Sequence, residues 1–178
     1  SINHDLGIMY VTANNIPYEV YLTKNKEKLL YYDYESHFEV FKDQNGFPAS
    51  KPPWGTLTAL NLNDGKIIWQ VPFGEFLDLD INDSTKSGSP NFGGATGTAG
   101  DLIFATGTID KKVRAFNSLN GEEVWEYSLP YIGSNPPTIY SYENEQYVLI
   151  TSTGSLSLNR QFPEKAEFGN WLYSFKIN

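Results

Sequence analysis

An eleven-residue pattern occurs twice in this chain with the same internal spacing. Residues 59–69 read Ala-Leu-Asn-Leu-Asn-Asp-Gly-Lys-Ile-Ile-Trp, and residues 115–125 read Ala-Phe-Asn-Ser-Leu-Asn-Gly-Glu-Glu-Val-Trp, 56 residues further on. Ala, Asn, Gly and Trp occupy the same four positions in both copies. Each copy reads as a strand, an Asn/Gly turn in which glycine takes a positive φ, and a second strand ending in Trp. A repeat of this period predicts a solenoid or a propeller.

The tryptophan that ends each copy has a role in such a fold. An indole at the edge of one repeat can wedge against the turn of the next repeat and bury on the order of 200 Å² of surface. We therefore expect Trp69 and Trp125 each to be buried against a neighbouring blade.

Composition supports an all-β protein and excludes several function classes. Aromatic residues make up 15% of the 178 residues, with 15 Gly and 10 Pro, a mixture of strand formers and turn formers. The net charge of −8 argues against a nucleic-acid partner, whose phosphates would be repelled. The absence of cysteine excludes disulfides and thiolate metal sites. No apolar run approaches the ~18 residues of a membrane span.

Three segments share a turn followed by an apolar strand that ends in small residues, namely 5–12, 100–107 and 145–152. Apolar runs of this length are typical of strands buried on both faces. Each is followed by a further related strand, at 57–61, 113–117 and 172–176.

These strands divide the chain into three β-meander units. We expect a blade over 1–75 with an insertion at 16–53, a blade over 90–130, and an incomplete blade over 131–178 that lacks its last strand. Propellers have four to eight blades, and an open arc leaves strand edges unpaired. The chain therefore reads as the C-terminal part of a larger propeller, either cut out or partnered by another chain.

Six short motifs, taken in order, resemble the C-terminal third of quinoprotein dehydrogenases, which depend on pyrroloquinoline quinone (PQQ). The membrane-bound glucose dehydrogenase branch is the most similar. The motifs are Pro-Pro-Trp-Gly-Thr-Leu-Thr-Ala at 52–59, Pro-Asn-Phe-Gly-Gly at 90–94, and the segments 98–104, 113–116, 121–125 and 146–150. Segments 6–11 and 14–17 match the strand and loop that open this region in the family, so the resemblance covers essentially the whole chain.

The resemblance implies an eight-bladed propeller with tryptophan-docking motifs, in which PQQ lies near the axis over Ca²⁺ or Mg²⁺. The catalytic Asp and the metal ligands of the family come from earlier blades, so we expect no catalytic residue and no metal ligand here. It further implies a sugar or polyol substrate, a quinone acceptor and a periplasmic location. Attachment to the inner membrane through an N-terminal region outside this segment is left open.

One candidate cofactor contact is the segment Asn91, Phe92, Gly93 and Gly94. Two glycines let a backbone approach a flat ring, and an asparagine amide can pair with a quinone or carboxylate oxygen. The resemblance places Phe92 and its backbone beside PQQ. From the residues alone, the alternative is an ordinary turn at the start of a blade.

A second candidate contact is the end of the first long strand, where Thr12, Asn14 and Asn15 lie. In the family a polar amide from this loop reaches PQQ, and the resemblance leaves open which of the three is the equivalent. Asn-Asn is also ordinary turn chemistry.

Other polar residues have simpler interpretations. His4 and His37 read as surface imidazoles, and Asp78, Asp80 and Asp83 read as part of a solvated linker. Arg114 reads as a charge on the exterior of a strand, and Arg160 is left open as a residue at the mouth of the pocket. The alternative function is a non-catalytic propeller scaffold or interaction module. The motifs at 52–55 and 90–94 argue against it, because a scaffold needs no backbone approach to a planar ligand.

Overall fold

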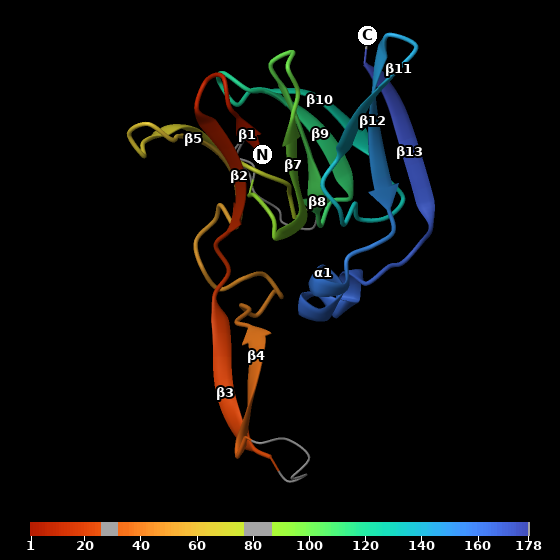
Figure 1. Ribbon diagram of the computed structural model, residues 1–178. Helices are drawn as coiled ribbons and strands as arrows, with labels where there is room; N and C mark the ends of the chain where they lie inside the picture. The colour runs from red at the N-terminus through yellow and green to blue at the C-terminus, as the bar shows by residue number, and fades with distance from the viewer. Residues whose placement is uncertain (26–31, 77–86, 178) are drawn as a thin grey trace.

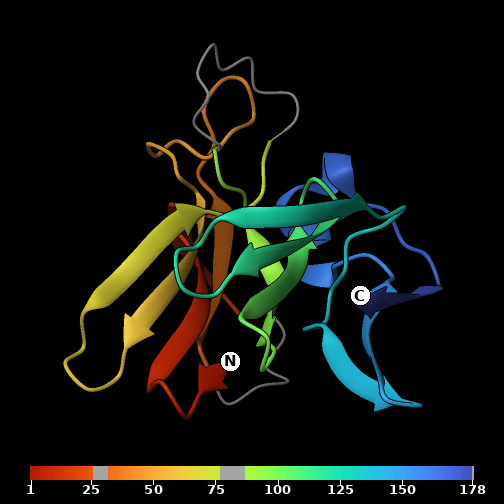
Figure 2. The ribbon, with the colours of Figure 1, turned by 90° about the horizontal axis from the view of Figure 1, so that it is seen from above.

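The computed structural model describes residues 1–25, 32–76 and 87–177. In these residues nearly all regular structure is β-strand, in three antiparallel sheets and one separate hairpin (Figure 1). Seen from above, the three sheets stand side by side in chain order (Figure 2). The prediction of an all-β protein is confirmed.

The first sheet has the strand order β1-β2-β5-β6 and uses residues from both sides of the insertion. Its strands are β1 (Ile2–Asn3), β2 (Ile8–Asn14), β5 (Gly55–Asn61) and β6 (Ile67–Pro72). Alternate residues of β5 point into the core, where Leu57 and Ala59 are fully buried. This period of two is what a strand with one buried face requires.

The second and third sheets follow the chain without crossovers. The second has the order β10-β9-β8-β7, and the third has the order β11-β12-β13. Their strands are β7 (Asn91–Gly97), β8 (Leu102–Thr108), β9 (Lys112–Asn117), β10 (Glu123–Ser128), β11 (Thr138–Tyr142), β12 (Glu145–Ser152) and β13 (Trp171–Ile177). The short helices α1 (Leu156–Gln161) and η1 (Pro163–Lys165) lie between β12 and β13.

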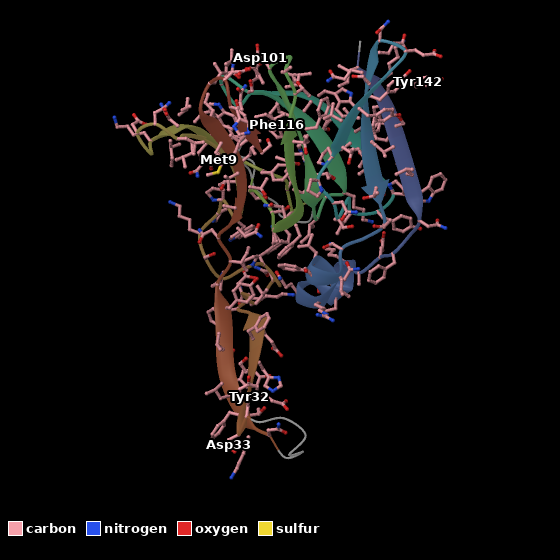
Figure 3. All side chains as sticks on the ribbon, viewed as in Figure 1. Met9, Tyr32, Asp33, Asp101, Phe116 and Tyr142 are labelled. Atoms are coloured by element: carbon pink, nitrogen blue, oxygen red, sulfur yellow. The ribbon has the colours of Figure 1, made fainter. Side chains whose placement is uncertain are left out.

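The predicted insertion contains a hairpin of β3 (Tyr18–Lys24) and β4 (Tyr34–Val40) that projects from the sheets. Tyr32 and Asp33 lie near its tip, far from the body of the molecule (Figure 3). Pairing of Val20 with Phe38 places apolar side chains on one face, and both are 66% exposed. Tyr21 and His37 stack on the opposite face.

Neighbouring sheets share cores. One cluster joins the first and second sheets, and its buried members are Tyr10, Leu57, Ala59, Phe73, Ile103, Ala105 and Phe116. Another cluster joins the second and third sheets, and its buried members are Phe104, Val113, Ala115, Leu129, Val148 and Ile150. Each sheet therefore buries apolar surface only because the next sheet covers it.

Trp69 ends the first copy of the repeat and packs on the turn of the second copy. Its Nε1 donates a hydrogen bond to the backbone oxygen of Ser118 at 3.0 Å. A Cβ atom at Gly121 would lie 2.6 Å from Cε3 of the indole, and Gly121 has a φ of +75°. The half-buried indole thus occupies the space that a side chain at position 121 would need.

The expectation for Trp125 is right about the contact with the neighbouring sheet and wrong about burial. This indole is 37% exposed and rests edge-on against Phe104 and Phe175, with ring centroids 6.4 and 5.2 Å away. The ring it meets in the described part of the third sheet is Phe175 of β13, and it also stacks on Tyr127 of its own strand at 6.3 Å.

The interpretation of Arg114 as an exterior charge is also wrong. Its side chain lies in β9 and is fully buried. The guanidinium pairs with the carboxylate of Asp110 and donates a hydrogen bond to Thr108 Oγ1 at 3.2 Å. Burial acts to lower the pKa of Arg114, and the hydrogen bond and charge of Asp110 outweigh it, so the pKa is raised. A buried cation is tolerated here because a buried carboxylate neutralises it.

The two glycines of the repeat allow a matched test of the Trp69 contact. Gly65 and Gly121 have φ values of +72° and +75°, but a Cβ atom at Gly65 would meet nothing within 4 Å. In the 178-residue chain, Gly65→Ala should cost about 1 kcal/mol of unfolding free energy through backbone strain alone. Gly121→Ala should cost about 2–4 kcal/mol, because it also displaces the indole. Denaturant unfolding measures both, and equal costs would show that the indole contact contributes nothing.

Candidate functional site

A cleft of about 800 Å³ opens between the β3–β4 hairpin, the start of β7 and the α1–η1 segment. Ligand sites typically have volumes of about 300–1,000 Å³. Tyr18 and Phe38 of the hairpin and Phe92 of β7 contribute aromatic surface to it. Arg160 and Gln161 of α1 contribute polar groups.

An aromatic cluster beneath the cleft joins the insertion to α1. Trp54 stacks on Phe47 with centroids 6.0 Å apart, and Phe76 meets both Trp54 and Phe162 edge-on. Trp54 Nε1 donates to the backbone oxygen of Ser50 at 2.8 Å. The Trp of the 52–59 motif thus holds together the elements that form the cleft.

Two of the predicted site residues, Asn14 and Asn91, meet across 77 positions of sequence. Asn14 Nδ2 donates to the backbone oxygen of Asn91 at 2.9 Å, and its Oδ1 accepts from the backbone nitrogen of Asn91 at 2.9 Å. Asn91 Nδ2 donates to the same Oδ1 at 2.8 Å, and Asn91 is 4% exposed. The side-chain amide of Asn14 therefore pairs with the backbone of Asn91 as a neighbouring strand would, and it holds the start of β7 in place.

Of the predicted residues, Phe92 is the one that lines the cleft, and its side chain is 41% exposed. Thr12 lies within β2, where it pairs with Leu57 of β5. The backbone nitrogen of Asn15 donates to the backbone oxygen of Trp54 at 2.9 Å. Thr12 and Asn15 therefore belong to the frame behind the cleft rather than to its lining.

Gly93 and Gly94 are explained by protein packing, which corrects the argument that their missing side chains leave room for a flat ring. A Cβ atom at Gly93 would lie 2.3 Å from the backbone oxygen of Thr106 and 2.6 Å from that of Gly133. Gly94 has a φ of +84°, and a Cβ atom there would lie 3.2 Å from Pro136. Both positions need glycine for the fold itself.

The charges of the cleft differ from those of the chain as a whole. In the part of the chain that the structure describes, its lining includes the cations Lys42 and Arg160 and a single acidic residue, Glu39, although the chain carries a net charge of −8. Lys42 Nζ lies 3.5 Å from Glu164 Oε1 and 4.4 Å from the centre of the Phe162 ring. Burial raises the pKa of the Tyr18 hydroxyl above its ordinary value.

Sequence reasoning missed most of the cleft. Strand alternation over 18–24 and 34–40 was a usable signal for the hairpin, because apolar or aromatic residues stand at 18, 20 and 22 and at 34, 38 and 40. The sequence left open whether Arg160 lies at the mouth of the pocket, and the structure places it in the lining because α1 packs on the aromatic cluster. Asp78, Asp80 and Asp83 lie outside the described residues.

Within residues 1–25, 32–76 and 87–177, no group of three or more His, Cys, Asp or Glu side chains converges as a metal site would require. In the same residues no helix is long and apolar enough to cross a membrane.

Solved structures share this fold. A quinohemoprotein alcohol dehydrogenase from Pseudomonas putida HK5 superposes on 99% of the chain with a TM-score of 0.67 at 19% identity, and the match covers 25% of that structure. A europium-containing methanol dehydrogenase superposes on 99% of the chain with a TM-score of 0.69 at 17% identity, over 32% of its length. These likenesses confirm the prediction of a propeller fragment.

Sequence comparisons identify the family. A quinate/shikimate dehydrogenase (quinone) from Acinetobacter baylyi is 36% identical over 72% of this chain, and quinoprotein glucose dehydrogenase A from Acinetobacter calcoaceticus is 33% identical over 81%. The chain spans 16% and 18% of the lengths of these two relatives. The model of the PQQ glucose/ethanol/alcohol dehydrogenase β-propeller domain matches residues 1–148. The chain therefore belongs to the family of PQQ-dependent quinoprotein dehydrogenase β-propellers.

Proposed function

We propose that this chain is the C-terminal, PQQ-binding portion of a quinoprotein dehydrogenase that oxidises glucose or another sugar or polyol and passes electrons to a quinone. The observation that carries the proposal is the cleft of about 800 Å³, because it is lined by Phe92, which lies in the stretch that the family model matches. Relatives named as quinate and glucose dehydrogenases support a polyhydroxylated substrate.

The residues of the cleft fit a flat, multiply charged cofactor. PQQ is a planar ring system that carries carboxylates, and the cleft combines aromatic surface from Phe92 and Phe38 with the cations Lys42 and Arg160. When bound, PQQ supplies the quinone that accepts electrons from the alcohol. Phe92 would form an apolar wall that keeps water from the ring, and Asn14 would act behind it as a positioning residue. We propose that residues outside this segment hold the Ca²⁺ or Mg²⁺ ion.

The proton of the alcohol must be taken by a base within hydrogen-bond reach. We assign that base to a residue outside this chain, as the family resemblance implies. Among the described residues that line the cleft, Glu39 is the only carboxylate, and it pairs in register with Glu19 on the hairpin. Glu39 is therefore the first residue to examine if the chain alone proves active.

The remaining blades of a propeller are the proposed partners, whether in the same or another chain. Gly65 occupies the position that Gly121 occupies under Trp69, yet nothing lies within 4 Å of its Cβ site. Trp125 is 37% exposed at the other end of the repeat. In the described residues no indole covers the turn at Gly65, and part of Trp125 is left exposed. Both surfaces would suit further blades. We propose that 1–75, 90–130 and 131–178 are blade units and that the assembled protein is periplasmic.

The Phe92 assignment is tested on the full-length protein that carries this segment. Phe92→Ala should raise the dissociation constant of PQQ about tenfold, ~1.4 kcal/mol, because an apolar wall of the site is lost. Phe41→Ala is the matched control, since Phe41 is 55% exposed and does not line the cleft. Titration of apo-protein with PQQ measures both. Unchanged affinity in a folded Phe92→Ala protein would remove Phe92 from the cofactor site.

The Asn14 contact predicts a loss of stability. Asn14→Ala leaves the buried backbone nitrogen and oxygen of Asn91 without this partner, which should cost about 1–3 kcal/mol. Asn15→Ala removes only an exposed side chain and should change stability by less than about 0.5 kcal/mol. Thermal unfolding of both variants measures the difference. A neutral Asn14→Ala would contradict the positioning role.

The 178-residue chain alone should show no dehydrogenase activity with added PQQ and Ca²⁺, because its base and metal ligands lie elsewhere. The full-length protein should turn over a sugar or polyol in a dye-linked assay only when PQQ is present. Turnover by the chain alone would place the base within these residues. A full-length protein that neither binds PQQ nor oxidises any polyol would instead support a propeller scaffold.

A further inference from the structure

Arg160 is a cation without a partner in a cleft of the right size for a ligand. Its side chain lines the cleft, and no hydrogen bond or ion pair joins it to any of the described residues. The chain carries 21 acidic residues against 13 basic ones, so an uncompensated arginine in a pocket is unusual for this protein. An arginine fork is suited to bind a carboxylate through two parallel hydrogen bonds.

The fold holds Arg160 in place. Ser155 caps α1 by accepting a hydrogen bond from the backbone nitrogen of Leu158. Leu158 and Phe162 flank Arg160 in sequence, and both are essentially fully buried in the aromatic cluster beneath the cleft. The backbone that carries the guanidinium is therefore anchored on both sides, and only the side chain has to be ordered when a ligand binds.

The groups around Arg160 define the rest of the ligand. Lys42 adds a second cation, although it is shared with Glu164 at 3.5 Å. Gln161 also lines the cleft, and its Oε1 is buried without a hydrogen-bond donor in the described residues. A buried acceptor of this kind is costly unless a ligand or water donates to it. Tyr18 and Phe38 of the hairpin supply flat aromatic surface to the same cleft.

We propose that Arg160, assisted by Lys42, binds the carboxylate of a ring-shaped ligand in this cleft, and that Gln161 Oε1 accepts a hydrogen bond from the same ligand. The inference rests on the proposed function and deepens it. The carboxylate belongs either to a carboxylated cyclic polyol as substrate or to PQQ itself. A hydroxyl donor for Gln161 is present in the polyol, which favours the substrate.

Three dissociation constants of the full-length protein test the proposal by calorimetry. They are those of PQQ for the apo-protein, and of quinate and glucose for the PQQ-loaded protein. Arg160→Gln should raise one of the two carboxylate constants at least tenfold, ~1.4 kcal/mol, and Arg160→Lys should raise it less. A change in quinate binding alone identifies a substrate site, whereas a change in PQQ binding identifies a cofactor site. Lys66→Gln is the matched control, because Lys66 lies outside the cleft and pairs with Asp64.

Three outcomes would overturn the proposal. They are no change in either carboxylate constant, an equal loss of glucose affinity, and an equal effect of Lys66→Gln. Circular dichroism and thermal unfolding show whether each variant is folded. If Arg160→Gln does not fold, the dissociation constants of Arg160→Lys are compared with those of the wild type instead. A wild-type protein that does not bind PQQ contradicts the proposed function instead. In that case quinate is titrated into the wild-type and Arg160→Gln proteins without PQQ, and the ratio of the two dissociation constants decides whether Arg160 binds the carboxylate.

Discussion

The backbones of the first and second sheets and their connections come into direct contact, and glycines make that approach possible. A Cβ atom at Gly55 would lie 1.9 Å from the backbone oxygen of Ser89, and one at Gly88 would lie 2.3 Å from the oxygen of Gly55. The indole of Trp69 closes the other end of the same interface on Gly121. These close contacts set how β7 stands against β2, and the position of β7 sets where Phe92 meets the cleft.

The functional surface therefore depends on a frame whose polar groups are already satisfied. Asn14 and Asn91 use their amides on each other, and Arg114 is neutralised by Asp110 inside the second sheet. Such groups lose their partners if they turn toward a ligand, so they stabilise the frame rather than bind. The groups still available for a ligand are those without partners, among which Arg160 and Gln161 Oε1 stand out.

Sequence patterns predicted the parts of the molecule that local rules determine. The repeat at 59–69 and 115–125 predicted strand pairs joined by positive-φ glycines, and the structure has both. The same repeat overestimated the burial of Trp125, because an indole is covered only by what the next sheet presents to it. Local patterns also misplaced Arg114, since nothing near it in sequence shows that Asp110 would be buried beside it. The sequence indicated that position 93 needs glycine, but it did not indicate the cause. The backbone oxygens of Thr106 and Gly133 occupy the space that a Cβ atom would need.

The cleft is formed largely by elements that lie outside the repeat. The β3–β4 hairpin interrupts the first sheet, and α1 interrupts the third sheet between β12 and β13. Neither element contributes a strand to the three sheets, so changes in length or charge there need not disturb the shared cores. Loops on a rigid scaffold can vary in this way while the scaffold is kept. Because Lys42 follows the hairpin directly and Arg160 lies in α1, the charges that line the cleft can change without any change in the packing that Trp69 and Gly121 maintain.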